Sequence, residues 1–318
     1  MALDIRSLDA CDSLYLSPHP DDVPRACGGR LLTEASRQQR ILVVTLFGGS
    51  PEPVRTLGVP DARQGALELP PAAQRNRYYS SFAALTEGRH PDDDAWLSQI
   101  AELLNDIRHR TRARQVYVPL GVGSHIDHRL CHEAALRVFS SGDGRNVFLY
   151  EERPEAVVPG AVRMRLGELG ARLPPAAAEA ADASSLAPFL LRFHVAAQAR
   201  GDLKGWPERL RSTGLAARRW RQGRDWHAQK GFGPRLQPVV QPLEGAAAAG
   251  LSRLREAWPL ASGRSAVRLQ ALSRRYSSRL GGENVERYWL LLPATEESGL
   301  SLPPGGPPEP RELPGRTG

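Results

Sequence analysis

The stretch Ser17-Pro18-His19-Pro20-Asp21-Asp22 follows the apolar run Leu14-Tyr15-Leu16 and precedes the pair Gly28-Gly29. An apolar run of this length predicts a buried strand, and the polar residues after it predict a turn into a helix. Open α/β sheets bind their ligands at the carboxyl ends of the strands. We therefore expect one histidine and two adjacent carboxylates to lie at a ligand-binding edge.

A second polar cluster, His125-Ile126-Asp127-His128, comes shortly after another strand-like run, residues 115–120. Parallel strands bring their carboxyl ends to the same edge of a sheet even when about a hundred residues separate them. His19, Asp22 and His128 could then share one metal ion. Two imidazoles, one carboxylate and an open position are the ligand set of catalytic zinc.

The three cysteines of the chain argue against a structural zinc site. Cys11, Cys27 and Cys131 have no paired spacing of the CxxC type, so a closed, cysteine-rich site is excluded. A catalytic site needs further groups, and the motifs supply them. The adjacent carboxylates Asp21 and Asp22 should point in different directions, so that one can bind the metal while the other accepts a proton from the water. His125 is a candidate donor to a developing oxyanion or leaving amine, and Asp127 a candidate partner that holds this imidazole.

Both motifs resemble those of the PIG-L/LmbE-like family of zinc-dependent N-acetylglucosamine deacetylases. The resemblance covers residues 12–152 and, loosely, residues 276–292. It implies His19, Asp22 and His128 as metal ligands, Asp21 as general base and His125 as oxyanion or acid partner. It also implies a hydrolase that removes the N-acetyl group of an aminosugar conjugate and releases acetate. Zinc is the expected ion, and Fe²⁺ would suit the same ligands.

Two departures from the family pattern concern the substrate. Relatives carry an Arg-x-x-Glu helix where this chain reads Pro51-Glu52-Pro53-Val54-Arg55-Thr56-Leu57-Gly58, and some have a tyrosine where this chain has Gly123. Arg75 and Arg77 fall where this branch often carries arginine. A guanidinium there would clamp a sugar hydroxyl, carboxylate or phosphate.

The order of apolar segments predicts the fold class. Apolar and helical patterns alternate over strands at 13–17, 40–47, 116–120 and 147–150 and helices at 29–39, 94–112 and 127–140. This alternation is typical of βαβ units. We predict an α/β, Rossmann-like doubly wound, mainly parallel sheet with helices on both faces.

The remaining segments suggest how the catalytic unit is completed. Residues 48–92, rich in Pro, Gly and Arg, are too long for an ordinary connection and suggest a lid or cleft wall. We expect a catalytic core at 1–152, a mostly helical C-terminal addition at 153–293 with a late strand at 288–292, and a disordered tail at 294–318. The tail is rich in proline and glycine and poor in apolar residues.

Composition limits the partners. The net charge of +7 permits nucleic-acid binding, but arginine spread over solvated helix faces explains it more simply. We therefore expect a small-molecule aminosugar conjugate as the partner, not nucleic acid. No apolar run approaches eighteen residues and the first residues do not follow the plan of a secretory signal, so we expect a cytoplasmic protein without a transmembrane segment.

Several alternatives stay open from sequence alone. The first motif could be an ordinary capped turn, and Gly28-Gly29 could cradle a phosphate or pack closely against a neighbouring element. His132 could be a fourth ligand, although a place on the helix surface is the simpler expectation. The same machinery could cleave another amide of a glycoconjugate. A catalytically inactive protein that binds carbohydrates or polyanions is the alternative from another class.

Overall fold

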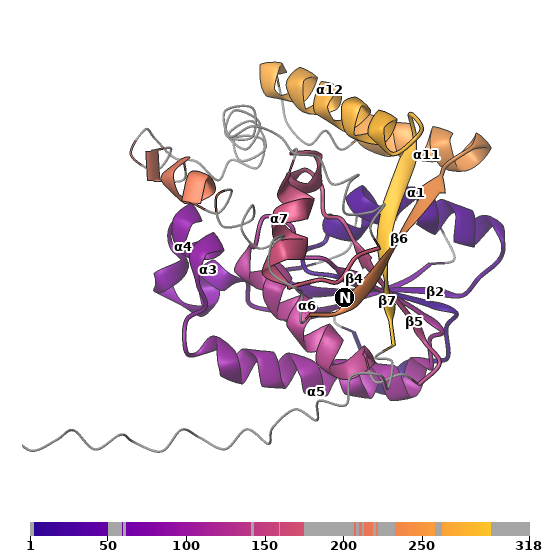
Figure 1. Ribbon diagram of the computed structural model, residues 1–318. Helices are drawn as coiled ribbons and strands as arrows, with labels where there is room; N and C mark the ends of the chain where they lie inside the picture. The colour runs from indigo at the N-terminus through magenta and orange to yellow at the C-terminus, as the bar shows by residue number, and fades with distance from the viewer. Residues whose placement is uncertain are drawn as a thin grey trace, which may run out of the picture.

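The computed structural model describes residues 3–49, 59, 62–140, 143–158, 160–174, 207, 210–211, 213–218, 221, 233–257 and 263–293. One seven-stranded sheet organises them, in the order β3-β2-β1-β4-β5-β7-β6 (Figure 1). Its strands are β1 Ser13–Ser17, β2 Ile41–Phe47, β3 Arg63–Leu69, β4 Gln115–Pro119, β5 Asn146–Tyr150, β6 Arg235–Pro242 and β7 Val285–Leu292. The helices are α1 Asp22–Ser36, α3 Ala72–Arg75, α4 Phe82–Glu87, α5 Asp93–Thr111, α6 Ile126–Phe139, α7 Ala161–Glu168, α11 Gly245–Ala257 and α12 Gly263–Arg279, with 3-10 turns η1 Ile5–Ser7, η2 Arg77–Tyr79 and η3 Glu155–Val157.

The first five strands are parallel, and their order reverses beside β1. β1 pairs with β2 on one side and with β4 on the other. The chain therefore leaves β1 in one direction across the sheet and later returns to its other side, which creates a topological switch point between β1 and β4. Both sequence motifs follow these two strands, so they meet at the switch point.

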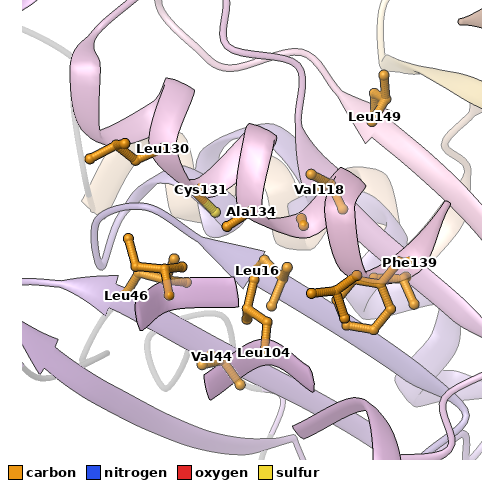
Figure 2. Packing of buried hydrophobic residues seen from close by; sticks show 14 of the residues in the cluster. Leu16, Val44, Leu46, Leu104, Val118, Leu130, Cys131, Ala134, Phe139 and Leu149 are labelled. Carbon is orange, nitrogen blue, oxygen red and sulfur yellow. The ribbon is translucent and has the colours of Figure 1, made fainter. Parts of the chain in front are cut away.

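Helices cover both faces of the sheet, which confirms the predicted doubly wound class. On one face, α5 and α6 pack their apolar sides onto β1, β2 and β4, as Figure 2 shows for Leu16, Val44, Leu104, Val118 and Ala134. On the other face, α1 packs against the sheet and α11 packs against α1. Tyr15 and Tyr117 stack there in parallel, with ring centroids 4.2 Å apart. The strands read as continuous apolar runs because both faces are buried.

Helix α1 begins earlier than the sequence indicates. It begins at Asp22, directly after the first motif, rather than at Gly29. The Ser17 hydroxyl accepts the Val23 N–H at 3.2 Å and so caps the first turn, and Pro24 is tolerated there because first-turn amides need no helical partner. Gly29 lies inside the helix, where a Cβ would stand 2.1 Å from Leu243. Close packing, rather than phosphate binding, explains this glycine.

Two edge strands were not predicted. β3 lies within the segment expected to form a lid or cleft wall. One side of an edge strand is solvated, so β3 contains polar residues and lacks the continuous apolar pattern that predicts a strand. β6 contains Pro238 and Pro242, and among the described strands of the sheet its only neighbour is β7. Proline is tolerated at an edge because its missing N–H would face away from the ladder.

The late strand does return to the sheet as predicted. β7 pairs antiparallel with β5, and its Glu286 contacts α1 across the sheet face. Both carboxylate oxygens of Glu286 accept helix amides, from Gly29 at 2.8 Å and from Arg30 at 2.9 Å, and Oε2 also accepts the Tyr288 hydroxyl at 2.7 Å. Glu286 therefore ties the C-terminal strand to the helix that follows the first motif.

No helix in the described part of the chain has the length and apolar character needed to cross a membrane. The predicted disordered tail at 294–318 and the segment 51–58 lie outside the described residues, and the boundary at residue 152 stays a prediction.

Replacing Glu286 by alanine should destabilise the fold. Truncation leaves two buried N–H groups without their carboxylate, at a cost of about 3 kcal/mol in the free energy of unfolding. Urea denaturation followed by circular dichroism measures it. The matched control is Glu283→Ala, an exposed residue on the same approach to β7, which should change the free energy by less than about 0.5 kcal/mol. Equal losses in both variants would contradict this role of Glu286.

Candidate metal centre

Three potential metal ligands converge at the switch point. The Asp22 Oδ2 atom lies 3.3 Å from His19 Nδ1 and 3.2 Å from His128 Nε2, and the two ring nitrogens lie 3.3 Å apart. Two ligand atoms bound at about 2.0–2.2 Å to one tetrahedral ion stand roughly 3.3–3.6 Å apart. The three donor atoms therefore form a triangle that fits one zinc-sized ion.

Local structure explains how the first motif presents its ligands. His19 and Asp22 stand three residues apart across the turn between β1 and α1. The Asp22 carboxylate accepts the His19 backbone N–H at 2.9 Å, and the Ser17 hydroxyl donates to the His19 carbonyl at 2.5 Å. These bonds turn both side chains toward the same point.

Each histidine uses its second ring nitrogen to bind a carboxylate. His19 Nε2 donates to Asp127 Oδ2 at 3.0 Å, and His128 Nδ1 donates to Glu152 Oε1 at 3.2 Å. Such partners fix the ring orientation and the tautomer of metal-binding histidines. Both remaining nitrogens, His19 Nδ1 and His128 Nε2, therefore point to the shared centre.

Glu152 was not predicted from sequence. It lies two residues beyond the end of β5 and is fully buried. Its two oxygens accept the backbone amides of Gly121 at 2.6 Å and Val122 at 3.1 Å, so it also holds the loop after β4. A carboxylate placed just after a parallel strand was the available signal.

Asp127 has a different partner from the one predicted. Its Oδ2 lies 3.0 Å from His19 Nε2 but 4.0 Å from His125 Nδ1, so it orients His19 rather than His125. The Ala72 N–H also donates to this oxygen at 3.2 Å. His19, His125 and Asp127 form a second set of donor atoms within 4.8 Å of one another. Because Asp127 is already engaged by these donors, the His19, Asp22 and His128 set fits an ion better.

His125 lies beside the candidate centre as the N-cap residue of α6. Its ring centroid stands 5.3 Å from that of His19 and 5.5 Å from that of His128. Its Nδ1 accepts the Asp127 backbone N–H at 3.3 Å, so Nε2 carries the ring proton. Its side chain is 22% exposed. His125 can therefore present an N–H donor to a bound molecule.

Asp21 occupies the N-cap position of α1 without capping it. Its carboxylate instead pairs with Arg25 at 2.5 Å, and its side chain is 30% exposed. Asp21 is adjacent to a ligand in sequence yet outside the triangle of donor atoms, which is the placement expected of a proton acceptor.

The two predicted substrate arginines are placed differently. Arg77 is exposed on η2. The Arg75 side chain is only 1% exposed and bonds to Asp127 at 2.6 Å, behind the candidate centre. A guanidinium in this position contacts protein carboxylates rather than a molecule in the cleft. The position of Arg75 therefore does not support its predicted role as a substrate clamp.

Two further positions differ from the sequence-based interpretation. His132 is not on the helix surface: it is buried, and its Nδ1 donates to the Pro119 carbonyl at 2.8 Å. Burial is also the main cause that lowers its pKa to about 3. Gly123 adopts φ +82° and a Cβ there would stand 2.6 Å from Glu155. A tyrosine at this position would be strained and would clash, which explains the departure from the family pattern.

The electrostatics of the centre favour charged forms. Burial opposes protonation of the two histidines, but hydrogen bonds to Asp127 and Asp22 raise the pKa of His19 to about 9, and Asp22 and Glu152 raise that of His128 to about 10. Against the opposing effect of burial, the His128 charge holds the pKa of Asp22 well below its usual range. The metal-free site thus keeps protons where a metal ion would bind.

A sheet with helices on both faces and a two-histidine, one-carboxylate cluster at its switch point defines the class of the protein: a Rossmann-like α/β protein with a candidate catalytic metal centre. Residues 14–139 match the family model PIG-L: GlcNAc-PI de-N-acetylase. This match confirms the family resemblance that the two motifs predict.

Individual proteins with similar sequences or structures include deacetylases. The chain is 29% identical over 162 residues to the 2'-N-acetylparomamine deacetylase of Streptomyces fradiae, a match that covers 45% of this chain and 57% of that protein. The chain thus matches little more than half the length of this relative. Two crystal structures show the same fold. They are a deacetylase–teicoplanin complex (TM-score 0.52, 15% identity, 89% of this chain and 99% of that chain) and a deacetylase–bog complex of teicoplanin biosynthesis (0.50, 16%, 89% and 99%).

Replacing Glu152 by glutamine should weaken zinc binding. The amide cannot supply the anionic acceptor for His128 Nδ1, and loss of such a partner typically costs 10- to 100-fold in metal affinity. Competition with a chelator measures the zinc Kd. The control is Glu151→Gln, because the neighbouring carboxylate bonds to Arg287 at 2.7 Å instead. Unchanged affinity in the Glu152 variant would exclude the orienting role.

Zinc affinity should rise with pH. The pKa values of His19 and His128 are raised above the ordinary value of about 6.5, so their charged forms stabilise the metal-free protein below that pH, and this contribution is lost as the pH rises through 9–10. Zinc must displace at least one proton. Between pH 6.5 and 8.5 we expect the zinc Kd to fall about tenfold per pH unit for each proton that zinc displaces. A flat profile from chelator competition would contradict these shifts.

Proposed function

We propose that the protein is a zinc-dependent hydrolase that removes the N-acetyl group of an N-acetylglucosamine-type conjugate. The observation that carries the proposal is the triangle of His19 Nδ1, Asp22 Oδ2 and His128 Nε2, at separations of 3.2–3.3 Å. His125 lies beside it, and Asp21 directly precedes Asp22 in the sequence. The deacetylase names of the PIG-L family and of the Streptomyces fradiae relative support the reaction type.

Zinc held by these three residues would supply Lewis acidity to the acetyl carbonyl and to the attacking water. The chain's own groups would do the remaining work. Asp21 accepts a proton from the water while the water oxygen forms its bond to the acetyl carbon. His125 donates an N–H hydrogen bond to the oxygen on which negative charge develops. When the C–N bond breaks, the leaving nitrogen takes up the proton that Asp21 accepted from the water, and acetate and a free amine are released.

The intact set of motif residues favours catalysis over simple binding. A protein that only bound carbohydrate would have no chemical need for a proton acceptor at position 21 next to a metal ligand. The Asp21 and His125 side chains are partly exposed, at 30% and 22%, so a substrate can contact them. Of the three proposed ligands, Asp22 and His128 are buried, at 2% and 1%, and His19 is 24% exposed.

The substrate class that we propose is a small aminosugar conjugate. One relative is named as a deacetylase of 2'-N-acetylparomamine, and one of the similar structures is a deacetylase in complex with teicoplanin. We further propose Fe²⁺ as an ion that the same ligands accept, and a cytoplasmic location.

The test is acetate release from a panel of N-acetylglucosamine and N-acetylated aminoglycoside conjugates by protein of measured metal content. Asp21→Asn should retain the metal and lose about 10²- to 10⁴-fold in kcat. His128→Ala should lose the metal itself. The control is Asp12→Asn, an exposed aspartate that pairs with Arg40 at the opposite end of β1.

Each outcome decides between the alternatives. Release that follows metal content and is lost in Asp21→Asn supports deacetylation. Stoichiometric metal without acetate from any conjugate would instead point to another amide or to binding alone. Full activity in Asp21→Asn would remove the proposed base, and equal metal content in both variants would contradict the assigned roles.

A further inference from the structure

The Arg75 side chain is almost completely enclosed beside the buried carboxylate of Asp127. It follows β3 on the short helix α3 and its side chain is 1% exposed. One guanidinium nitrogen, Nη1, donates to Asp127 Oδ1 at 2.6 Å and to the Pro70 carbonyl at 3.1 Å. The other, Nη2, donates to Asp93 Oδ1 at 3.4 Å. A buried arginine with these partners is committed to the protein.

The two carboxylates that Arg75 joins begin two different helices. Asp93 is the first residue of α5 and Asp127 the second residue of α6. Both are buried. Aspartate is favoured at such positions by the helix dipole, but two buried carboxylates facing each other would repel. The planar guanidinium resolves this because it can bond to both at once.

Aromatic side chains fix the plane of this guanidinium. Its carbon lies 4.9 Å from the Phe47 ring centroid and 5.8 Å from that of Trp96. Asp93 is in turn bonded by the Tyr79 hydroxyl, which also accepts the His90 N–H at 2.7 Å. The contact with Asp127 therefore belongs to a network that extends through residues 75–93.

We propose that Arg75 is a positioning residue for the metal centre: it holds Asp127 so that this carboxylate orients His19 as a ligand. Asp127 Oδ1 bonds to Arg75 while Oδ2 bonds to His19 Nε2, so the carboxylate cannot rotate away from the histidine. This inference rests on the proposed metal site, and it assigns Arg75 a task other than binding substrate.

The test compares Arg75→Ala and Arg75→Lys with the wild-type protein. The zinc Kd is measured by chelator competition without substrate, the Co²⁺ form by its d–d absorption spectrum, and kcat and KM on an active conjugate. We expect Arg75→Ala to weaken zinc binding 10- to 100-fold, to alter the Co²⁺ spectrum, and to lower kcat with KM changed less than twofold. Lysine keeps the charge but cannot bridge both carboxylates, so it should recover part of the affinity.

The matched control is Arg89→Ala. Arg89 also connects this segment to α6, through Glu133 at 2.5 Å, but its side chain is 29% exposed. Its loss should leave the zinc Kd and the Co²⁺ spectrum unchanged. If Arg75→Ala does not fold, Arg75→Lys carries the test.

Three results would overturn the proposal. A tenfold or larger rise in KM with unchanged zinc affinity would make Arg75 a substrate contact. A lower melting temperature with unchanged zinc affinity and spectrum would make it purely structural. Equal losses of affinity in the Arg75 and Arg89 variants would make the effect nonspecific. Zinc binding is measured without substrate, so failure of the deacetylase proposal alone would leave this test intact.

Discussion

The placement of buried charge at one edge of the sheet is the constraint on which the rest of the structure depends. Asp22, Asp127 and Glu152 are all buried there, together with His128. Isolated carboxylates in such a place would cost several kcal/mol each. They persist because every one of them bonds to an imidazole and, in addition, to a backbone amide or a guanidinium.

These bonds also hold the loops around the centre in place. Glu152 joins the loop after β4 to the end of β5, and Asp127 joins α6 to α3. The same groups that would hold an ion thereby hold the loops. The parallel topology makes the arrangement possible, because β1, β4 and β5 all end at this edge and each delivers one part of the network.

The fold and the centre could be predicted where the signal is local. Apolar runs locate β1, β2, β4 and β5, and the two motifs locate His19, Asp22 and His128. What could not be predicted depends on contacts distant in sequence. Glu152 and Arg75 carry no motif, and their roles come from partners 24 and 52 residues away. β3 and β6 were not predicted because an edge strand does not need a continuous apolar sequence and can contain proline.

The contribution of Asp127 shows the same limit at shorter range. Sequence proximity suggests His125 as its partner, two residues away on the same turn. Yet His125 is the N-cap of α6 and its Nδ1 is turned to the backbone amide of Asp127, so the carboxylate faces His19 instead. The capping geometry of a helix thus decides which histidine receives the charge.

The C-terminal strand β7 holds parts of the candidate centre that lie outside the segment matched by the PIG-L family model. Residues 14–139 supply all three candidate ligands, but Glu152, which orients His128, lies beyond them. The adjacent Glu151 bonds to Arg287 and to the Trp289 indole of β7, and Glu286 of the same strand bonds to the amides of α1. β7 therefore fixes both the segment that carries Glu152 and the helix that begins at Asp22. A candidate ligand from each motif is thus held, directly or through one neighbour, by a strand that lies far beyond both motifs in the sequence, so the geometry of the centre depends on the completed sheet.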